Sequence, residues 1–179
     1  SLCGPTPVFC DSDPDTFNMD PVSLKQQIRK ILDAGKLKPR AVIAVDLFGL
    51  PADFPAIEKI CSQYDLTLIE DAAQGFGGAV GGRKACSFGK YSGTSFFPAK
   101  ALGCYGDGGA VFTDDDGAFR ILQSLRVHGK GNFKYDNVRL GLNARLDTLQ
   151  AAILLPKLHA FDEENEHRKH AAARYARLL

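Results

Sequence analysis

Two different spacings of apolar residues alternate along the first part of the chain. Residues 21–34 have apolar positions at helical spacing and are followed by Gly35, so they predict a helix that ends at this glycine. Residues 40–49 form a continuous apolar and β-branched run, which predicts a strand buried on both faces. Residues 51–65 predict a second helix with one apolar face, and residues 66–71 predict a second strand. The succession strand, helix, strand indicates a βαβ unit, and therefore an α/β fold with a parallel sheet.

The rest of the chain alternates short apolar runs with glycine-rich turns and finishes with helical patterns. The expected elements are a short strand at 7–9, two short strands or turns within 75–93, a strand at 106–115 whose aspartates cap a helix at 118–129, an irregular loop or hairpin at 129–143, and helices at 146–158 and 159–179. The last helical pattern stops without a cap. We therefore expect that both ends of the chain are cut points within a longer protein.

Composition narrows the class of protein without identifying its function. The 179 residues are 45% hydrophobic and 24% charged with a net charge of +1, which is typical of a globular protein. There is no long run of like charge to attract nucleic acid or an anionic membrane, and no membrane-length apolar stretch or signal peptide. The five cysteines are odd in number and none are spaced C-x-x-C, which favours free thiols in a reducing cytoplasm.

Two segments carry residues that suggest a specific chemistry. LTLIEDAAQ (66–74) is an apolar strand that ends in the carboxylates Glu70 and Asp71, and TSFFPAK (94–100) delivers Lys100 into a glycine-rich loop. Pyridoxal phosphate chemistry needs such a pair, because a lysine holds the cofactor aldehyde as a Schiff base while a carboxylate keeps the pyridine nitrogen protonated. The flanking residues predict that Lys100 lies close to backbone, where burial would lower its pKa. The alternative for Asp71 is a helix cap.

Other interpretations of the same residues fit less well. The run GFGGAVGG resembles a dinucleotide-binding loop, but Val80 occupies the position of its third glycine, and no P-loop string is present. His167 and His170 could bind a metal, although a solvated helix face with ion pairs explains them better, and we expect no metal site. Cys104 could be a nucleophile, but no recognisable base accompanies it, so we interpret it as a loop residue.

Three longer segments, EDAAQGFGG, SFGKYSGTSFFPAKALGCYGDGGAVFTDD and LRVHGKGNFKYDNVRLGLNARLDTLQAAIL, resemble the DegT/DnrJ/EryC1/StrS family of pyridoxal phosphate-dependent sugar aminotransferases. The resemblance covers nearly the whole chain. It implies an α/β fold, the large domain of a fold-type I pyridoxal phosphate-dependent transferase, with a mostly parallel sheet flanked by helices. Residues 1–156 would be part of this domain, and residues 157–179 would begin the helix that links it to a small domain.

The resemblance also implies a role for each residue that matches a family position. Lys100 would be the Schiff-base lysine and the proton shuttle, and Asp71 would pair with the pyridine nitrogen. Gln74 would lie against the ring hydroxyl, and Ser95 would hydrogen-bond the cofactor phosphate. Asn143 would reach the phosphate of the partner subunit's cofactor, which implies a homodimer with shared active sites.

The expected function is transfer of an amino group from an amino acid, by resemblance glutamate, to a nucleotide-linked keto sugar. The product would serve amino-sugar and surface-polysaccharide biosynthesis. One alternative is a sugar dehydratase of the same family, although those enzymes have histidine where Lys100 stands. Another is a non-catalytic homologue, or a fragment that binds nothing by itself. The sequence does not distinguish the keto sugar, the nucleotide, or C3 from C4 amination.

Overall fold

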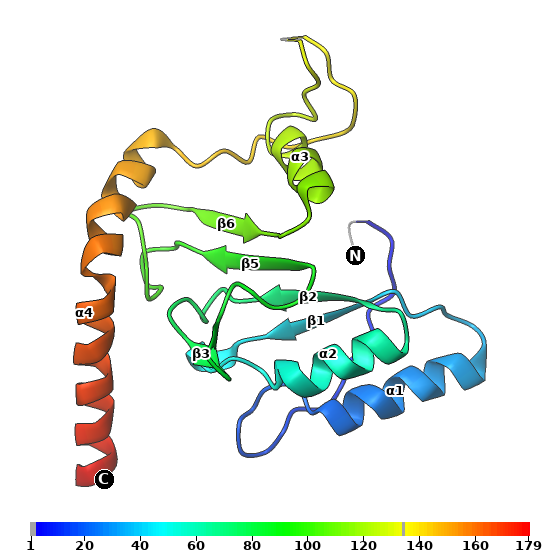
Figure 1. Ribbon diagram of the computed structural model, residues 1–179, viewed down its shortest axis with the longest axis horizontal. Helices are drawn as coiled ribbons and strands as arrows, with labels where there is room; N and C mark the ends of the chain where they lie inside the picture. Colours follow the sequence, from blue (N-terminus) through cyan, green and yellow to red (C-terminus); the bar gives the residue numbers. More distant parts are fainter. Residues whose placement is uncertain (1–2, 134) are drawn as a thin grey trace. The chain divides into compact units, whose positions relative to one another are not determined.

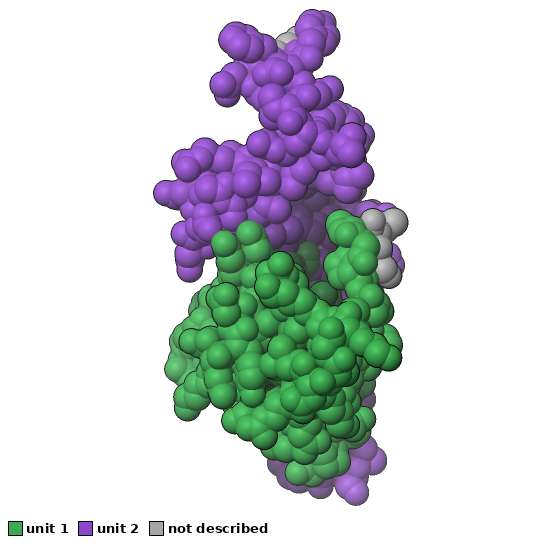
Figure 2. Space-filling view, turned by 90° about the vertical axis from the view of Figure 1, so that its right-hand side faces the viewer, with its two compact units in different colours: residues 1–94 green, residues 95–179 purple. Residues whose placement is uncertain are grey.

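The computed structural model describes residues 3–133 and 135–179 (Figure 1). The chain divides into two compact units, residues 1–94 and 95–179 (Figure 2). The elements up to the boundary are α1 (Pro21–Ala34), β1 (Ala41–Val45), the short 3-10 helix η1 (Leu47–Gly49), α2 (Phe54–Gln63), β2 (Thr67–Asp71), β3 (Ala79–Val80), β4 (Arg83–Lys84) and β5 (Tyr91–Ser95). The second unit continues with β6 (Gly109–Phe112), α3 (Asp116–Leu125) and α4 (Thr148–Leu178).

A parallel sheet forms the centre of the first unit. Strand β2 lies between β1 and β5 and is parallel to both. Val45 of β1 is opposite Asp71 of β2, and Asp71 is opposite Gly93 of β5. This arrangement confirms the predicted βαβ unit and the α/β class, and it places Asp71 at the carboxyl edge of the sheet, where ligands bind in open α/β folds.

Helices α1 and α2 cover one face of this sheet (Figure 1). The buried apolar residues that join the helices to the strands are Leu24, Ile28, Val42, Ala44, Ile57, Ile60, Cys61 and Leu68. On the other face of β1, Ile43 and Val45 are exposed within the described chain. The prediction that this strand is buried on both faces is therefore wrong. A continuous apolar run shows that both faces can be buried, but it does not supply the element that buries the second one.

The ends of α1 follow directly from the residues that stand there. Asp20 caps the helix by accepting the N–H groups of Val22 and Ser23. Gly35 ends it with a φ of 65°, a left-handed conformation that glycine adopts without a steric penalty. The sequence prediction of residues 21–34 with a stop at Gly35 is confirmed.

The second unit differs from its prediction mainly in the C-terminal helices. The patterns at 146–158 and 159–179 form one continuous helix, α4, with Pro156 inside it. A proline removes one hydrogen bond but need not end a helix whose neighbouring turns are intact. Asp115 caps α3 through the Ala118 N–H, as predicted.

Two further predictions concern irregular segments. Residues 129–143 form a loop closed by isolated β-bridges, which fits the expected loop or hairpin, although residue 134 lies outside the described residues. The segment 7–9 is not a strand, and the first bridge joins Ser12 to Met19. In the described chain, no helix combines the length and apolar character needed to cross a membrane.

Candidate active site

Asp71 ends β2 on the sheet face opposite the two helices. Side chains alternate along a strand, so the preceding Glu70 points into the helix-covered core while Asp71 is half-buried on the other side. Its Oδ1 accepts the Ala73 N–H at 3.1 Å. Residues 73–77 form turns, so the alternative reading of Asp71 as a helix cap is wrong. The second carboxylate oxygen is left to accept a hydrogen bond from a protonated ligand nitrogen.

Gln74 lies in the turn that follows β2 and has an exposed side chain. Its Oε1 accepts the N–H of Phe48 at 2.8 Å, from η1 at the end of the neighbouring strand. With the oxygen engaged in this way, the amide nitrogen of Gln74 is the group that can donate to an anionic ligand oxygen. The structure thus places Asp71 at the end of β2 and Gln74 in the turn that follows it. Asp71 supplies a hydrogen-bond acceptor, and Gln74 supplies a donor.

Ser95 and Lys100 flank a tight turn in the second unit. The Ser95 hydroxyl accepts the Phe97 N–H at 3.2 Å, and the Lys100 N–H donates to the Phe97 carbonyl at 2.9 Å. Lys100 is half-buried, and nothing in the described chain pairs with its ammonium group. A lysine without an ion-pair partner keeps its amine available for covalent chemistry.

The loop after Lys100 is held by its own backbone and by α4. A Cβ on Gly103 would lie 2.7 Å from the Pro98 carbonyl oxygen, so the turn leaves no room for a larger residue. Gln150 accepts the Tyr105 N–H at 2.8 Å, and Lys157 donates to the Gly103 carbonyl. The sequence analysis missed Gln150 and Lys157, because polar residues on an otherwise apolar helix do not indicate which loop they bind.

Cys104 lies in the same loop and is fully buried. Its sulfur is 3.0 Å from the Phe96 carbonyl oxygen and 3.1 Å from that of Gly106. A buried thiol that donates to backbone is a packing group rather than a reactive one, which agrees with its interpretation as a loop residue. In residues 3–133 and 135–179, no cluster of three His, Cys, Asp or Glu side chains could hold a metal ion.

Asn143 stands apart from Ser95 and Lys100 in the chain, on the segment that leads to α4. It forms an isolated bridge with Val127, and its exposed Oδ1 accepts the Arg145 Nε–H at 3.2 Å. The neighbouring His128 has a positive φ of 59° and donates its N–H to the Leu142 carbonyl. The amide nitrogen of Asn143 is a further hydrogen-bond donor of this side chain.

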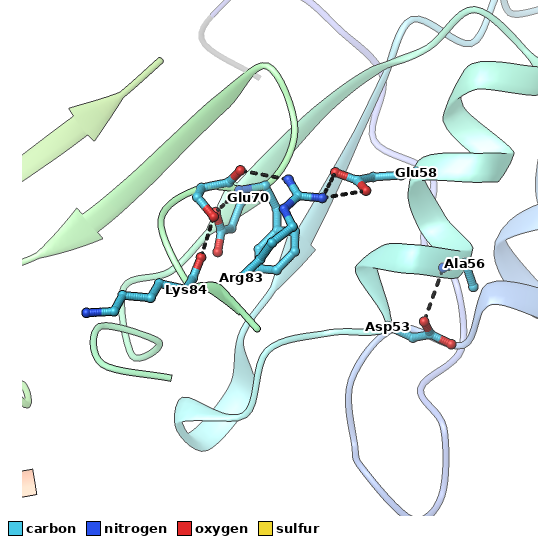
Figure 3. A network of polar contacts seen from close by, with 8 residues as sticks. Asp53, Ala56, Glu58, Glu70, Arg83 and Lys84 are labelled. Atoms are coloured by element: carbon cyan, nitrogen blue, oxygen red, sulfur yellow. Dashed lines mark hydrogen bonds and ion pairs between the residues drawn. The ribbon is translucent and has the colours of Figure 1, made fainter. Parts of the chain in front are cut away.

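A second acid, which the sequence analysis did not single out, lies beneath this edge of the sheet. Asp46 follows β1 directly and is fully buried, as is Glu70. Burial, and then the charge of Glu70, raise the pKa of Asp46 to about 7. The guanidinium of Arg83 is directed at Glu58 instead, at 2.9 Å (Figure 3). Only the pairing of β1 with β2 reveals this proximity, since nothing in the sequence links the two acids.

The five predicted site residues fall into two local groups. Asp71 and Gln74 belong to the first unit, whereas Ser95, Lys100 and Asn143 belong to the second. The first group offers a hydrogen-bond acceptor and an amide donor, and the second offers a hydroxyl, an amide and the amine of Lys100. Each of these groups is of a kind that pyridoxal phosphate chemistry uses.

Comparison with known proteins agrees with this chemistry. The profile of the DegT/DnrJ/EryC1/StrS aminotransferase family matches residues 1–179. The chain is 47% identical to the UDP-2-acetamido-2-deoxy-3-oxo-D-glucuronate aminotransferase of Pseudomonas aeruginosa, over 98% of this chain and 46% of that protein. It therefore spans about half the length of the curated relatives it matches.

Solved structures of the same family share the fold. A DegT DnrJ EryC1 StrS aminotransferase from Brucella abortus superposes with a TM-score of 0.95 at 49% identity, over 97% of this chain and 47% of that one. DesV of S. venezuelae, solved in complex with a ketimine intermediate, gives 0.87 at 36% identity, over 95% and 44%. The chain belongs to the DegT/DnrJ/EryC1/StrS aminotransferase family.

Proposed function

We propose that the protein is a pyridoxal phosphate-dependent aminotransferase that moves an amino group from an amino acid, glutamate, to a nucleotide-linked keto sugar. Family membership over the whole chain supports the reaction type. The relative from Pseudomonas aeruginosa, whose name specifies a UDP-linked 3-oxo sugar acid, supports the substrate class. The observation that carries the proposal is Lys100, which is half-buried after a tight turn and has no partner for its amine among the described residues.

The chain's own residues would hold the cofactor by complementary groups. Asp71 would accept a hydrogen bond from the ring nitrogen, and Gln74 would donate one to the ring oxygen. Ser95 would bind the phosphate, and Asn143 would bind the phosphate held by a partner subunit. When bound, the cofactor supplies an electron sink for a carbanion next to the amine.

Lys100 has two tasks in this proposal. Its Nζ would hold the cofactor covalently, and once the amino donor is bound its amine would be free for proton transfer. The neutral amine then acts as general base and general acid, taking a proton from one carbon and returning it to another. Asp71 would accept the hydrogen bond of the ring nitrogen and so favour the protonated form of that nitrogen.

The assembly and cellular setting are parts of the same proposal. An exposed Asn143 with a free amide nitrogen suits a residue that completes a neighbouring subunit's site, so we expect a homodimer. Nucleotide-linked sugars and reduced cysteines both favour the cytoplasm. We assign the product to amino-sugar and surface-polysaccharide biosynthesis.

The test is to trap the cofactor on its lysine. The full-length protein is mixed with pyridoxal phosphate, reduced with borohydride and digested, and the peptides are mapped by mass. The adduct is expected on the peptide that contains Lys100, and it should be lost in Lys100→Ala but kept in a matched control, Lys84→Ala, at an exposed lysine. An adduct on another lysine, or none, would overturn the proposal. Addition of glutamate before reduction should convert the bound cofactor to its amine form and abolish trapping.

A further inference from the structure

The two buried acids below the sheet edge occupy one face of neighbouring strands. Glu70 of β2 is paired in register with Ala44 of β1, and Asp46 lies two residues beyond Ala44. Side chains two residues apart in a strand point to the same side, so Asp46 and Glu70 both point toward the helices. Both have 0% exposure, and after burial the charge of Glu70 is the next largest cause of the raised pKa of Asp46.

Glu70 is the hydrogen-bond acceptor of this pair. Its Oε1 accepts the Cys86 N–H at 2.8 Å, and its Oε2 accepts the Phe88 N–H at 2.9 Å. Each oxygen thus accepts one backbone N–H and keeps a second lone pair that can accept a further donor. These bonds also fix Phe88, whose ring stacks on Phe54 of α2 at a centroid distance of 4.3 Å.

Asp46 has an environment that disfavours a second charge. Its Oδ1 accepts the Ala52 N–H at 3.3 Å, while its buried Oδ2 receives no donor in the described chain. The groups that face it are the carboxylates of Glu70 and Asp71 and, beside Glu70, the Cys86 thiol, whose pKa burial raises to about 11 and so keeps neutral. Two unscreened carboxylates at this depth repel each other strongly, and one proton removes the repulsion.

We propose that Asp46 carries a proton on Oδ2, donates it to Glu70, and thereby positions Gln74 for the cofactor. The pKa of about 7 for Asp46 agrees with a proton retained up to neutral pH. Asp46 is the first residue of the turn that contains η1. Its N–H donates to the Asp71 carbonyl, its carbonyl accepts the Gly49 N–H, and the Phe48 N–H of this turn holds Gln74.

The positioning part rests on the proposed function, because Gln74 matters only if a ligand uses it. The protonation part does not. Asp46 is a positioning residue in this scheme, since it acts on the ligand only through the turn and Gln74. Asp46 Oδ2 lies against Gly75, where a Cβ on that residue would clash with it, so the turn that carries Gln74 packs directly on the acid.

Infrared spectroscopy of the full-length protein tests the proton directly. A carbonyl stretch of a protonated carboxyl group is expected at pH 6, shifted by 13C-labelled aspartate but not by 13C-labelled glutamate, and absent in Asp46→Asn. A band that follows the glutamate label, a band that persists in Asp46→Asn, or no band would overturn the proposal. The measurement needs no cofactor, so it stands even if the aminotransferase assignment fails.

Paired substitutions test the hydrogen-bond direction. Asp46→Asn keeps a donor toward Glu70 and an acceptor toward Ala52, so the folded protein should tolerate it. Glu70→Gln places an NH2 group against a backbone N–H, so it should lower the urea midpoint. Equal tolerance of both variants, or the reverse order, would contradict the assignment of the proton to Asp46.

Hydrogen exchange at the Phe48 amide tests the positioning. Asp46→Leu, which fills the site without a donor, should speed exchange at Phe48 about tenfold relative to the core amides of β2, and Asp46→Asn should restore protection. The affinity for pyridoxal phosphate should fall in Asp46→Leu and recover in Asp46→Asn. Unchanged exchange at Phe48 would refute the positioning role. Loss of affinity alone in both variants, with Phe48 protected, would also refute it.

Discussion

Gly75 is the residue at which the packing beneath the site is tightest. In Gly75→Ala, the new Cβ would lie 2.2 Å from Asp46 Oδ2 and 2.8 Å from Asp46 Cβ, so a turn or the acid must shift. We expect the free energy of unfolding to fall by about 1–3 kcal/mol, the usual range for overpacking. Urea unfolding of the full-length variant measures this change.

Gly93 supplies the matched control for that substitution. A Cβ on this glycine would meet nothing within 4 Å, and its φ is not in the left-handed region. Gly93→Ala should therefore change stability by less than about 1 kcal/mol, and in the stabilising direction if reduced freedom of the unfolded chain dominates. Similar losses in both variants would show that the close contact with Asp46 is not what constrains Gly75.

Asp71 is expected to act on catalysis much more than on folding. Its side chain has one local contact, the Ala73 N–H, which Asp71→Asn can keep through its carbonyl oxygen. The neutral amide cannot hold the ring nitrogen protonated, so kcat should fall by about 10² or more, the scale at which loss of one electrostatic group affects an enzyme. Steady-state kinetics with the lysine adduct as a binding control would check this. A normal kcat in Asp71→Asn would show that the charge of Asp71 is not needed for catalysis.

The cap of α1 gives a prediction for a single element. Asp20 accepts two backbone N–H groups at the start of this helix, so Asp20→Ala should cost about 1 kcal/mol of stability. Asp33 lies near the other end of the same helix, which is capped by Gly35, and Asp33→Ala should be neutral or slightly stabilising because a negative charge is unfavourable there. Thermal unfolding of the two variants compares them. Equal losses would rule out the cap.

Helix α4 should determine how firmly the loop after Lys100 is held. Gln150→Met removes the acceptor for the Tyr105 N–H while keeping the length and helix propensity of the side chain. Hydrogen exchange at Tyr105 should then speed up by about tenfold, because the amide loses its partner. The exchange at Ala118, whose amide is bound by Asp115, serves as the internal reference. Unchanged exchange at Tyr105 would show that the loop does not depend on α4.

The elements that sequence reasoning predicted best are those with chemical signals at their ends. Asp20 and Gly35 mark α1, and Asp115 marks α3, because a cap or a left-handed glycine acts within a few residues. Exposure of Ile43 and the continuity of α4 through Pro156 escaped prediction. Both features depend on which other parts of the protein pack against the element, and the local sequence does not specify those neighbours.

Stability of the whole molecule should vary with pH in a direction set by Asp46. Burial and the charge of Glu70 raise its pKa to about 7 in the folded state, against about 4 in an unfolded chain. A raised pKa means that the folded state holds a proton the unfolded state has lost. The contribution is therefore fully present below pH about 4, declines as the pH rises through about 7, and is constant above it.

Unfolding by urea from pH 4 to pH 9 measures this dependence. The difference in free energy of unfolding between the wild type and Asp46→Asn isolates the acid from other titrating groups such as the histidines. We expect that difference to shift in favour of Asp46→Asn as the pH rises, and to level off above neutral pH. A difference that is constant over the range would contradict a raised pKa for Asp46.

For the protein as a whole, the sequence predicted the family and the fold class, and both are confirmed. The site was predicted only in part. Lys100 and Asp71 were singled out as a lysine and an acid at element ends, and their roles, like those of Gln74, Ser95 and Asn143, remain predictions. Asp46 could not be found, because its partner Glu70 is brought to it by strand register and not by any spacing in the sequence.

The alternation within β2 has a consequence for how this protein can change over evolution. Glu70 and Asp71 are neighbours in sequence but lie on opposite faces of the sheet. Glu70 is buried on the helix-covered face, and Asp71 is half-buried on the other face. Deleting a single residue upstream in the strand would exchange the two acids, whereas deleting two would return each to its own side. We therefore expect this strand to tolerate changes of length by two residues better than changes by one, because only the former keep each acid on its own side of the sheet.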